Sequence, residues 1–419
     1  MASKWRNALI ALRSSNSLGR PTVNPVPAPR HPIVPLPQHI TAQLATELFE
    51  LILDFLSPLP DAAQTLVACA LVCRAWRPRS QHLLERLRVV RPRAFAGIVH
   101  GGYGSLLCAT MVPGLTTTGA VVYGATDGVY LGGGDGSRTR LAIMRNVARV
   151  EVFPDVDLFV CLADSALVSI PLRALLTRTH QDDFRRYSKN LIYLSVLRST
   201  SPGEPHRIVG LKSSALSGTI KVFDIVAAQN GGASLVLTWE LYIPLETTSI
   251  RFLSRTRVAA ALKGAIQGQG GFEMLDLTSG QTQSLLDPAD GDLAFAFASG
   301  ARRDGLGRPI TVFRVAGHFL LCYERTGFFI DRHGHLAADF GKFQWNVQAP
   351  SAFVYHAPYL LVFAAQLIEV WDIESGKIVQ TVRGVYLPLN MPEEEHDAVL
   401  VLDLRTKELT ELEFPNLRR

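Results

Sequence analysis

The sequence predicts a mostly β protein, a seven-bladed β-propeller preceded by a small α-helical domain. Three observations support this prediction. The chain has 419 residues, of which 47% are hydrophobic and 19% charged, so most of it should be globular. Clear helical periodicity is found only near the N-terminus. Beyond it, a strand–turn–strand unit recurs at the roughly 35 to 60 residue spacing of propeller blades. We expect a basic, Pro-rich tail and linker in residues 1–40, a helical domain in 41–93 and the propeller in 94–419.

The tail carries the whole net charge of the chain. Residues 1–46 contain five basic residues and no Asp or Glu, whereas the rest of the chain is balanced. A balanced surface disfavours nucleic-acid binding, which needs clustered Lys and Arg. The first twenty residues, MASKWRNALIALRSSNSLGR, have the Arg-rich, acid-free composition of a mitochondrial transit peptide. The alternative is a disordered basic arm that ends in the Pro-rich linker.

The cysteine pattern bears on the compartment. Five cysteines are scattered without a CxxC pair, and the chain has no N-x-S/T sequon. This suits buried thiols in a reducing interior. The apolar runs are interrupted too often to form a transmembrane segment. We expect a soluble protein of the cytoplasm or nucleus, with the mitochondrion as the alternative if the N-terminal segment is a transit peptide.

Residues 41–93 have the pattern of short apolar helices. The first carries an apolar stripe from Leu44 to Leu56 and ends at the prolines that follow. Asp61 and Gln64 have capping-box spacing ahead of a second helix, which we expect to extend to Trp76. A third short helix follows. Helices this small cannot bury so much Leu and Trp alone, so part of their surface is expected to bind a partner. The alternative is a helical cap packed against the β-region.

LATELFELILDFL at 44–56, followed by ACALVCRAWRPRSQHLL at 68–84, resembles an F-box. The resemblance implies that the apolar helix faces bind the Skp-type adaptor of a cullin–RING ubiquitin ligase. The Leu-Pro pair that usually opens the motif is Leu44-Ala45 here, whereas a Leu-Pro pair stands earlier at Leu36-Pro37. Each residue of the adaptor face could instead pack in the core. The predicted adaptor-binding residues are Leu44, Leu48, Leu51, Ile52, Leu71, Val72 and Trp76.

The β-region repeats one design, a short apolar strand, a turn and a second apolar strand. A hairpin cannot bury its apolar face alone, and radial stacking covers such faces while leaving only short edges. The seven copies are AVVYGATDGVYLGG, DLFVCLADSALVSIPL, RIVGLKSSALSGTIKVFDIV, RVAAALKGAIQGQGGFEMLDL, HFLLCYERTGFFIDRHG, PYLLVFAAQLIEVWDIESGKIV and HDAVLVLDLRTKELTEL.

Turn chemistry agrees with this design. We expect Gly128, Gly327 and Gly376 to supply the positive φ that tight turns need. An Asp recurs at one place in several units. Repetition argues for architecture rather than catalysis, so each carboxylate should accept hydrogen bonds from the amides of the turn that follows. These residues are Asp224, Asp276, Asp372 and Asp403.

The last unit, near Leu400–Leu404, is one or two strands short. We expect a strand at Phe95–Val99 or at Leu106–Met111 to complete it and so join the two ends of the domain. Deletion of residues 94–112 should then collapse the thermal stability of the chain.

Several motifs of the β-region share their order with a known domain. They include VVYGATDGVYL, DLFVCLADSALVSIPLRAL, LYIPLETTSIRFL, FRVAGHFLLCYERTGFFIDRHG and FVYHAPYLLVFAAQLIEVWDIESGKIVQ. From residue 115 to 390 the chain resembles a citron-homology (CNH) domain, most of all that of fungal Rho guanine-nucleotide exchange factors. The resemblance implies a propeller that binds proteins, including small GTPases and their regulators. The catalytic helical domain and the lipid-binding neighbour of those factors have no counterpart before residue 115, so exchange activity is not implied.

The sequence has no recognisable catalytic constellation, and we expect no enzyme activity. It lacks the GxxxxGK[ST] and GxSxG motifs, and LGGGDGS at 131–137 does not follow GxGxxG. Cys69 and Cys73 have no histidine pair to complete a zinc site. The acidic run Glu393–Asp397 is better explained as a solvated loop than as a cation site. We therefore predict no cofactor, no metal site and no catalytic residue.

Two functional hypotheses follow. In the first, the chain is the substrate receptor of a cullin–RING (SCF-type) ligase, with the F-box on the adaptor and the propeller on a protein target. In the second, the propeller is a scaffold that binds Rho- or Rab-type small GTPases or their regulators in signalling or vesicle traffic, without a ubiquitin ligase role. An enzyme is a third class, which a polar cluster at the axial mouth of the ring would favour.

Overall fold

The computed structural model describes residues 46–56, 62–72, 76–86, 88–99, 104–112, 120–133, 137–179, 184–199, 201, 203–227, 232–263, 271–297, 305–392 and 397–415. The chain forms two compact units, which are described separately. One is helical and the other, Pro92–Glu413, is a ring of sheets.

The helical unit consists of α3 (Thr46–Leu56), α4 (Ala62–Val72) and α5 (Trp76–Arg86). Its core is small. Leu53, Leu66, Cys69 and Leu83 are its buried residues, and Leu56, Trp76 and Leu84 pack around them. A two-bond ion pair joins α3 to α5, because Arg79 donates to both carboxylate oxygens of Asp54 at 2.9 and 2.6 Å. The prediction that the second helix extends to Trp76 is wrong, since Trp76 is the first residue of α5.

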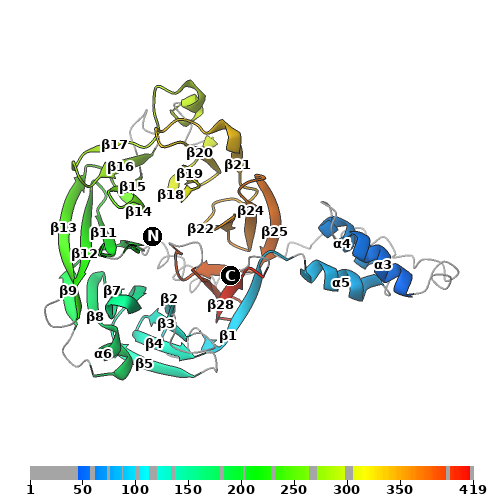
Figure 1. Cartoon of the computed structure of the whole chain (residues 1–419), viewed down its shortest axis with the longest axis horizontal. Coiled ribbons are helices and arrows are strands. Elements are labelled where there is room, and N and C mark those ends of the chain that lie inside the picture. The colour runs from blue at the N-terminus through cyan, green and yellow to red at the C-terminus, as the bar shows by residue number, and fades with distance from the viewer. Residues whose placement is uncertain are drawn as a thin grey trace, which may run out of the picture. The chain divides into compact units, whose positions relative to one another are not determined.

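The β unit contains seven four-stranded antiparallel sheets, which we call blades 1 to 7 (Figure 1). In blades 1 to 6 the strands follow one another in sequence order from the innermost to the outermost strand. The predicted fold class, a seven-bladed propeller with short helices before it, is confirmed.

Blade 1 is β2 (Leu106–Val112), β3 (Ala120–Ala125), β4 (Gly128–Gly133) and β5 (Arg138–Ile143). Blade 2 is β6 (Val147–Phe153), β7 (Leu158–Ala163), β8 (Ala166–Pro171) and β9 (Arg185–Ser188). Blade 3 is β10 (Tyr193–Leu197), β11 (Arg207–Ser213), β12 (Gly218–Ala227) and β13 (Ala233–Ile243). Blade 4 is β14 (Thr247–Ser254), β15 (Arg257–Leu262), β16 (Phe272–Asp276) and β17 (Thr282–Ser284).

Blade 5 is β18 (Pro309–Val315), β19 (His318–Tyr323), β20 (Thr326–Ile330) and β21 (Lys342–Gln344). Blade 6 is β22 (Ala352–His356), β23 (Tyr359–Phe363), β24 (Leu367–Asp372) and β25 (Lys377–Arg383). Blade 7 is β26 (Tyr386–Pro388), β27 (Val399–Asp403), β28 (Glu408–Glu413) and β1 (Arg91–Val99). Short helices α6 (Leu172–Thr177) and α7 (Ala294–Phe297) lie in connections.

The ring is closed by the two ends of the β unit. β1 is the outermost strand of blade 7 and lies next to β28. Arg93 of β1 donates to Glu413 of β28 at 2.8 Å. Ile98 of β1 is buried over blade 1, where a Cβ on Gly132 would lie 2.3 Å from its Cδ1. Of the two segments proposed to complete the ring, β1 does so, whereas Leu106–Val112 opens blade 1.

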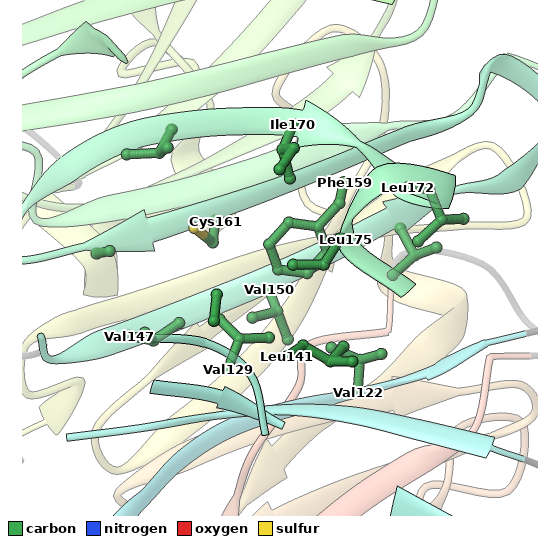
Figure 2. Close-up of a cluster of buried hydrophobic side chains, with 14 of the residues drawn as sticks. Val122, Val129, Leu141, Val147, Val150, Phe159, Cys161, Ile170, Leu172 and Leu175 are labelled. Atoms are coloured by element: carbon green, nitrogen blue, oxygen red, sulfur yellow. The ribbon is translucent and has the colours of Figure 1, made fainter. Parts of the chain in front are cut away.

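The core consists of apolar layers between neighbouring blades. Figure 2 shows the layer between blades 1 and 2, where Val122 and Val129 face Val150 and Phe159, and Leu172 and Leu175 of α6 cover one side. The same arrangement recurs around the ring, because each strand presents alternate side chains to its two neighbouring blades. The four described cysteines are free and buried.

The turn predictions are partly confirmed. Asp276, Asp372 and Asp403 each accept hydrogen bonds from amides of the turn that follows. For Asp224 the prediction is wrong, because β12 continues past it and its carboxylate pairs with Arg207 at 2.8 Å. Gly376 has the expected positive φ of 65°.

For Gly128 and Gly327 the prediction of a positive φ is wrong, because both belong to strands, where the reason for glycine is space rather than backbone angle. A Cβ at Gly327 would lie 2.7 Å from the Trp345 ring, and one at Gly128 would lie 2.5 Å from the Ala142 carbonyl oxygen.

Candidate interaction surfaces

The helical unit has an exposed apolar face on α3 and α4. Leu51 is 53% exposed and Leu71 is 68% exposed, although both are leucines. The residues of this face are Leu48, Leu51, Ile52, Phe55, Val67 and Leu71. An exposed apolar patch of this kind is typical of an interaction site.

One predicted adaptor residue has a different position, and two others cannot be placed because they lie outside the described side chains. Trp76 packs against the small core of the unit. Val72 is the last residue of α4, and its side chain is outside the described residues, as is the whole of Leu44. Leu53 was not singled out in the sequence, yet it is the α3 residue that is 1% exposed. Leu51, Ile52 and Leu56 of the same helix are also apolar, so the periodicity alone does not identify the buried residue.

In the propeller, a segment of the chain crosses the axis of the ring. We call Leu389–Pro392 the axial segment. It receives hydrogen bonds from the innermost strands of four blades. Ala109 of β2 donates to the Leu389 carbonyl at 3.1 Å, and Arg251 of β14 donates to the Pro392 carbonyl at 2.9 Å.

Met391 makes the contacts in between. Arg149 of β6 donates to its carbonyl at 3.4 Å, and the Tyr193 hydroxyl of β10 lies 3.0 Å from its Sδ. The chain itself therefore fills part of the axis, where propellers often bind ligands.

Three charged groups on or next to the inner strands β6 and β10 form one network. Glu151 is buried between two guanidinium groups, with Arg149 at 2.7 Å and Arg198 at 3.2 Å from its oxygens. Arg198 also lies over the Phe153 ring, 4.7 Å from its centroid. This arrangement is a structural ion-pair network. It offers no nucleophile beside a base, which a hydrolytic site would need.

A recess of about 550 Å³ lies where blade 2 meets blade 3. Asp155 and Val156 line one wall, the loop before β11 lines another and Ile225 of β12 forms part of the apolar floor. The side chains of Asp155 and Glu204 are about half exposed, so two carboxylates face the opening. Arg255 lies 3.4 Å from Glu204 at its edge.

His206 is a buried polar residue of this recess. Its Nδ1 accepts the Ser199 backbone N–H at 2.9 Å, so the proton is on Nε2, which lies 2.6 Å from Asp155 Oδ2. The Phe153 ring packs 5.2 Å from the imidazole. Because the Ser199 contact is made by its main chain, the trio does not have the geometry of a Ser-His-Asp relay. The recess can instead hold a polar or cationic side chain of a partner.

Sequence reasoning did not find this recess. Asp155 and His206 are 51 residues apart in different blades, and neither lies in a recognisable motif. Among the described residues, no group of three or more His, Cys, Asp or Glu side chains could hold a metal ion. The acidic run considered as a cation site lies mostly outside the described residues. In the described part of the chain, no helix is long and apolar enough to cross a membrane.

Comparison with known proteins gives consistent matches for the propeller. Rho1 guanine nucleotide exchange factors 1 and 2 of Schizosaccharomyces pombe are 29% and 26% identical to this chain, over 63% and 58% of its length. RHO1 GDP-GTP exchange protein 2 of Saccharomyces cerevisiae is 28% identical over 58%. The matched stretch is only 20%, 21% and 18% of these three proteins, so this chain spans about a fifth of each relative.

Solved structures agree. The AfRom2 CNH domain is 25% identical and superposes with a TM-score of 0.62, covering 78% of this chain and 100% of that domain. The WD40 propeller of Doa1 has a TM-score of 0.51 at 12% identity, covering 78% of this chain and 98% of that one, which shows the shared fold alone. The model of the CNH domain family matches residues 119–390. The chain therefore belongs to the CNH domain family, and its propeller is similar to those of fungal Rho exchange factors.

Proposed function

We propose that this chain is a non-enzymatic scaffold whose propeller binds a Rho-type small GTPase or a regulator of one. The observation that carries the proposal is the match of the propeller to three Rho1 exchange factors. The match is to their CNH region, and the recess between blades 2 and 3 can hold a side chain of a protein partner. On this proposal the chain positions signalling proteins without catalysing nucleotide exchange.

A pull-down with purified components tests this function. The immobilised full chain should retain a Rho-type GTPase, or a purified regulator, from solution, and should leave the rate of nucleotide release unchanged. Leu51→Asp, in the helical unit, should not affect this binding. Failure to retain any Rho-type GTPase in either nucleotide state, or any regulator, would sink the proposal. Faster nucleotide release would contradict its non-enzymatic part.

A second candidate function is supported by the exposed apolar face of α3 and α4. On this proposal the face is an F-box surface that binds a Skp-type adaptor, and the propeller holds a target for a cullin–RING ligase. The chain would act by raising the effective concentration of the target near the ubiquitin-charged enzyme. The exposure of Leu48, Leu51, Ile52 and Leu71 favours such a docking role.

Co-purification separates the two functions. The wild-type chain should capture the adaptor, and Leu51→Asp should abolish capture, because a carboxylate in an apolar contact cannot be solvated. Leu216→Asp is a matched control, since Leu216 is also an exposed leucine but belongs to the propeller. The ligase hypothesis is wrong if the adaptor never accompanies the wild-type chain.

A further inference from the structure

Among the described residues, the outermost strand of each blade has one edge whose backbone N–H and C=O groups are paired with no other strand. Proteins shield such edges with charged residues, with proline or by keeping the strand short. In this propeller β1, β5, β9, β21 and β25 each contain Lys or Arg, and β17 has three residues. β13 is the exception. It has eleven residues, ASLVLTWELYI, without Lys, Arg or Pro.

The exposed side chains of β13 are mostly apolar. Val236 and Leu237 are each 45% exposed and Tyr242 is 64% exposed. Glu240 is the single charged residue of the strand, and Lys221 on β12 neutralises it at 3.0 Å. The edge is therefore long, apolar and neutral, which are the features of a strand that accepts another strand.

The geometry of β13 favours an extended segment over a second copy of the chain. Thr238 is an extra residue in β13, and its hydroxyl donates to the Val222 carbonyl at 3.1 Å. Such a bulge bends the strand and increases its twist, which a flexible segment can follow and a rigid propeller cannot. Eleven residues at ~3.4 Å each make an edge of about 37 Å.

The area of that edge also favours an extended segment over a second copy of the chain. With a sheet about 10 Å thick, two propellers touching along it would bury only about 740 Å² in total. A stable dimer needs about 1,200 Å² or more. A flexible segment is not limited to this strip, because its side chains can also cover neighbouring residues.

The neighbouring edge is basic. Arg185 and Arg186 on β9 are exposed, and among the described residues no ion pair involves either. Strand β9 lies beside β13. The ring centroids of Tyr187 on β9 and Phe223 on β12 are 6.5 Å apart, and Phe223 is paired with Leu237 on β13. A segment that runs along β13 and past Leu235 towards β9 would be complementary if acidic residues lie at that end.

We propose that the outer edge of β13 binds an extended segment of a partner protein as a fifth strand of blade 3. Apolar side chains of the segment cover Val236, Leu237 and Tyr242, and acidic residues at one end lie over Arg185 and Arg186. This surface goes beyond the proposed function, since it requires no GTPase and no adaptor. Its recognition comes from main-chain pairing plus charge.

The probe is a fluorescein-labelled twelve-residue peptide with three acidic residues followed by alternating Val and Thr. Its fluorescence anisotropy is measured against the full chain. We expect saturable binding that Leu237→Lys and Tyr242→Lys each weaken at least about tenfold. Methylation of alternate peptide amides should abolish binding, because it removes the donors of main-chain pairing. Ile143→Lys is the matched control, an exposed apolar residue on β5 that should not matter.

Charge reversal tests whether acidic residues of the segment lie over Arg185 and Arg186. Replacing the acidic residues of the peptide by Lys should weaken binding to the wild type, and the double variant Arg185→Glu/Arg186→Glu should reverse that preference. Thermal unfolding of each variant shows that it is folded. Equal binding of the methylated peptide, or no effect of both β13 variants, would overturn the proposal. So would a dimer of the full chain that Leu237→Lys dissociates, since the occupant would then be a second copy.

Discussion

Glu369 is a carboxyl group inside blade 6. It is 3% exposed, lies on β24 and accepts a hydrogen bond from the Trp371 indole N–H at 3.0 Å. Burial raises the pKa of this carboxyl above its ordinary value, and the Trp371 bond only partly offsets that effect. The folded protein therefore holds the Glu369 proton more tightly than the unfolded chain does.

The sign of the pH dependence follows. A carboxyl group with a raised pKa favours the folded state at low pH, and this contribution is lost as pH rises from the ordinary pKa through the raised one. Glu369→Gln cannot ionise and keeps an acceptor for Trp371. We expect the melting temperature of this variant, relative to that of the wild type, to rise as the pH is raised from 4 to 8. A constant difference across thermal melts in this range would contradict the expectation.

Asp403 shows how a repeated carboxylate supports a turn. It is buried, and its Oδ1 accepts the N–H groups of Arg405 at 2.8 Å and Thr406 at 3.3 Å. We expect Asp403→Ala to lower the free energy of unfolding by about 1–3 kcal/mol, because both amides lose their acceptor. Asp403→Asn keeps an oxygen in place and should cost less. Equal losses in urea unfolding would show that the two hydrogen bonds are not the cause.

At the scale of elements, β1 joins blade 7 by burial rather than by charge. Ile98 is 1% exposed in a cluster with Leu402 and Leu409, whereas Arg93 and Glu413 form an exposed ion pair. We expect Ile98→Ala to cost about 2–5 kcal/mol of unfolding free energy. Arg93→Ala should cost about 1 kcal/mol or less. Urea unfolding of the two full-length variants gives the comparison, and similar costs would mean that the ion pair anchors the strand.

The elements also show where sequence patterns stop. Alternating apolar residues and turn residues predict blade hairpins well, because they report which face is buried. They do not report a bulge. β13 changes its buried set at Thr238, so Leu235 packs towards blade 2 and Trp239 towards blade 4. No residue type in the sequence indicates this register shift. The exposed edge of β13 could therefore not be predicted from the sequence.

At the scale of the whole molecule, closure should make the ring unfold as one unit. Cys108, Cys161 and Cys322 lie in blades 1, 2 and 5 and are buried. Burial raises the pKa of Cys108 to about 12 and also raises those of Cys161 and Cys322. The folded thiols should therefore be almost unreactive at neutral pH, because the thiolate is the reactive form.

These thiols report cooperativity. In pulsed alkylation across a urea series, read by mass spectrometry, all three thiols should become reactive at the same urea concentration. The reason is that every blade of a closed ring packs against two others, so no blade is a free end that unfolds first. Earlier labelling of Cys322 than of Cys108 would indicate that blade 5 opens separately. Labelling in the absence of urea would contradict the closed ring.

The fold could be predicted from the sequence to a greater depth than its surfaces. Repeated hairpins, the chemistry of Asp276 and Asp372, and the shortage of strands at Leu400–Leu404 all follow from local pattern. The recess between blades depends on Asp155 and His206, which local pattern cannot bring together. The axial segment depends on contacts such as Arg149 with Met391, 242 residues apart. Such pairs become visible only when the ring is built.

The position of β1 also bears on how the chain is made. Arg93 and its partner Glu413 are 320 residues apart. At a synthesis rate of about 5–20 residues per second, a ribosome takes on the order of 15–60 seconds to bridge that interval. During this interval β1 has no strand to pair with. Each newly formed blade also has one apolar face that no neighbouring blade covers. Translation of an mRNA truncated before β28 would therefore give a polypeptide whose ring cannot close. Such a product would be bound by chaperones or degraded.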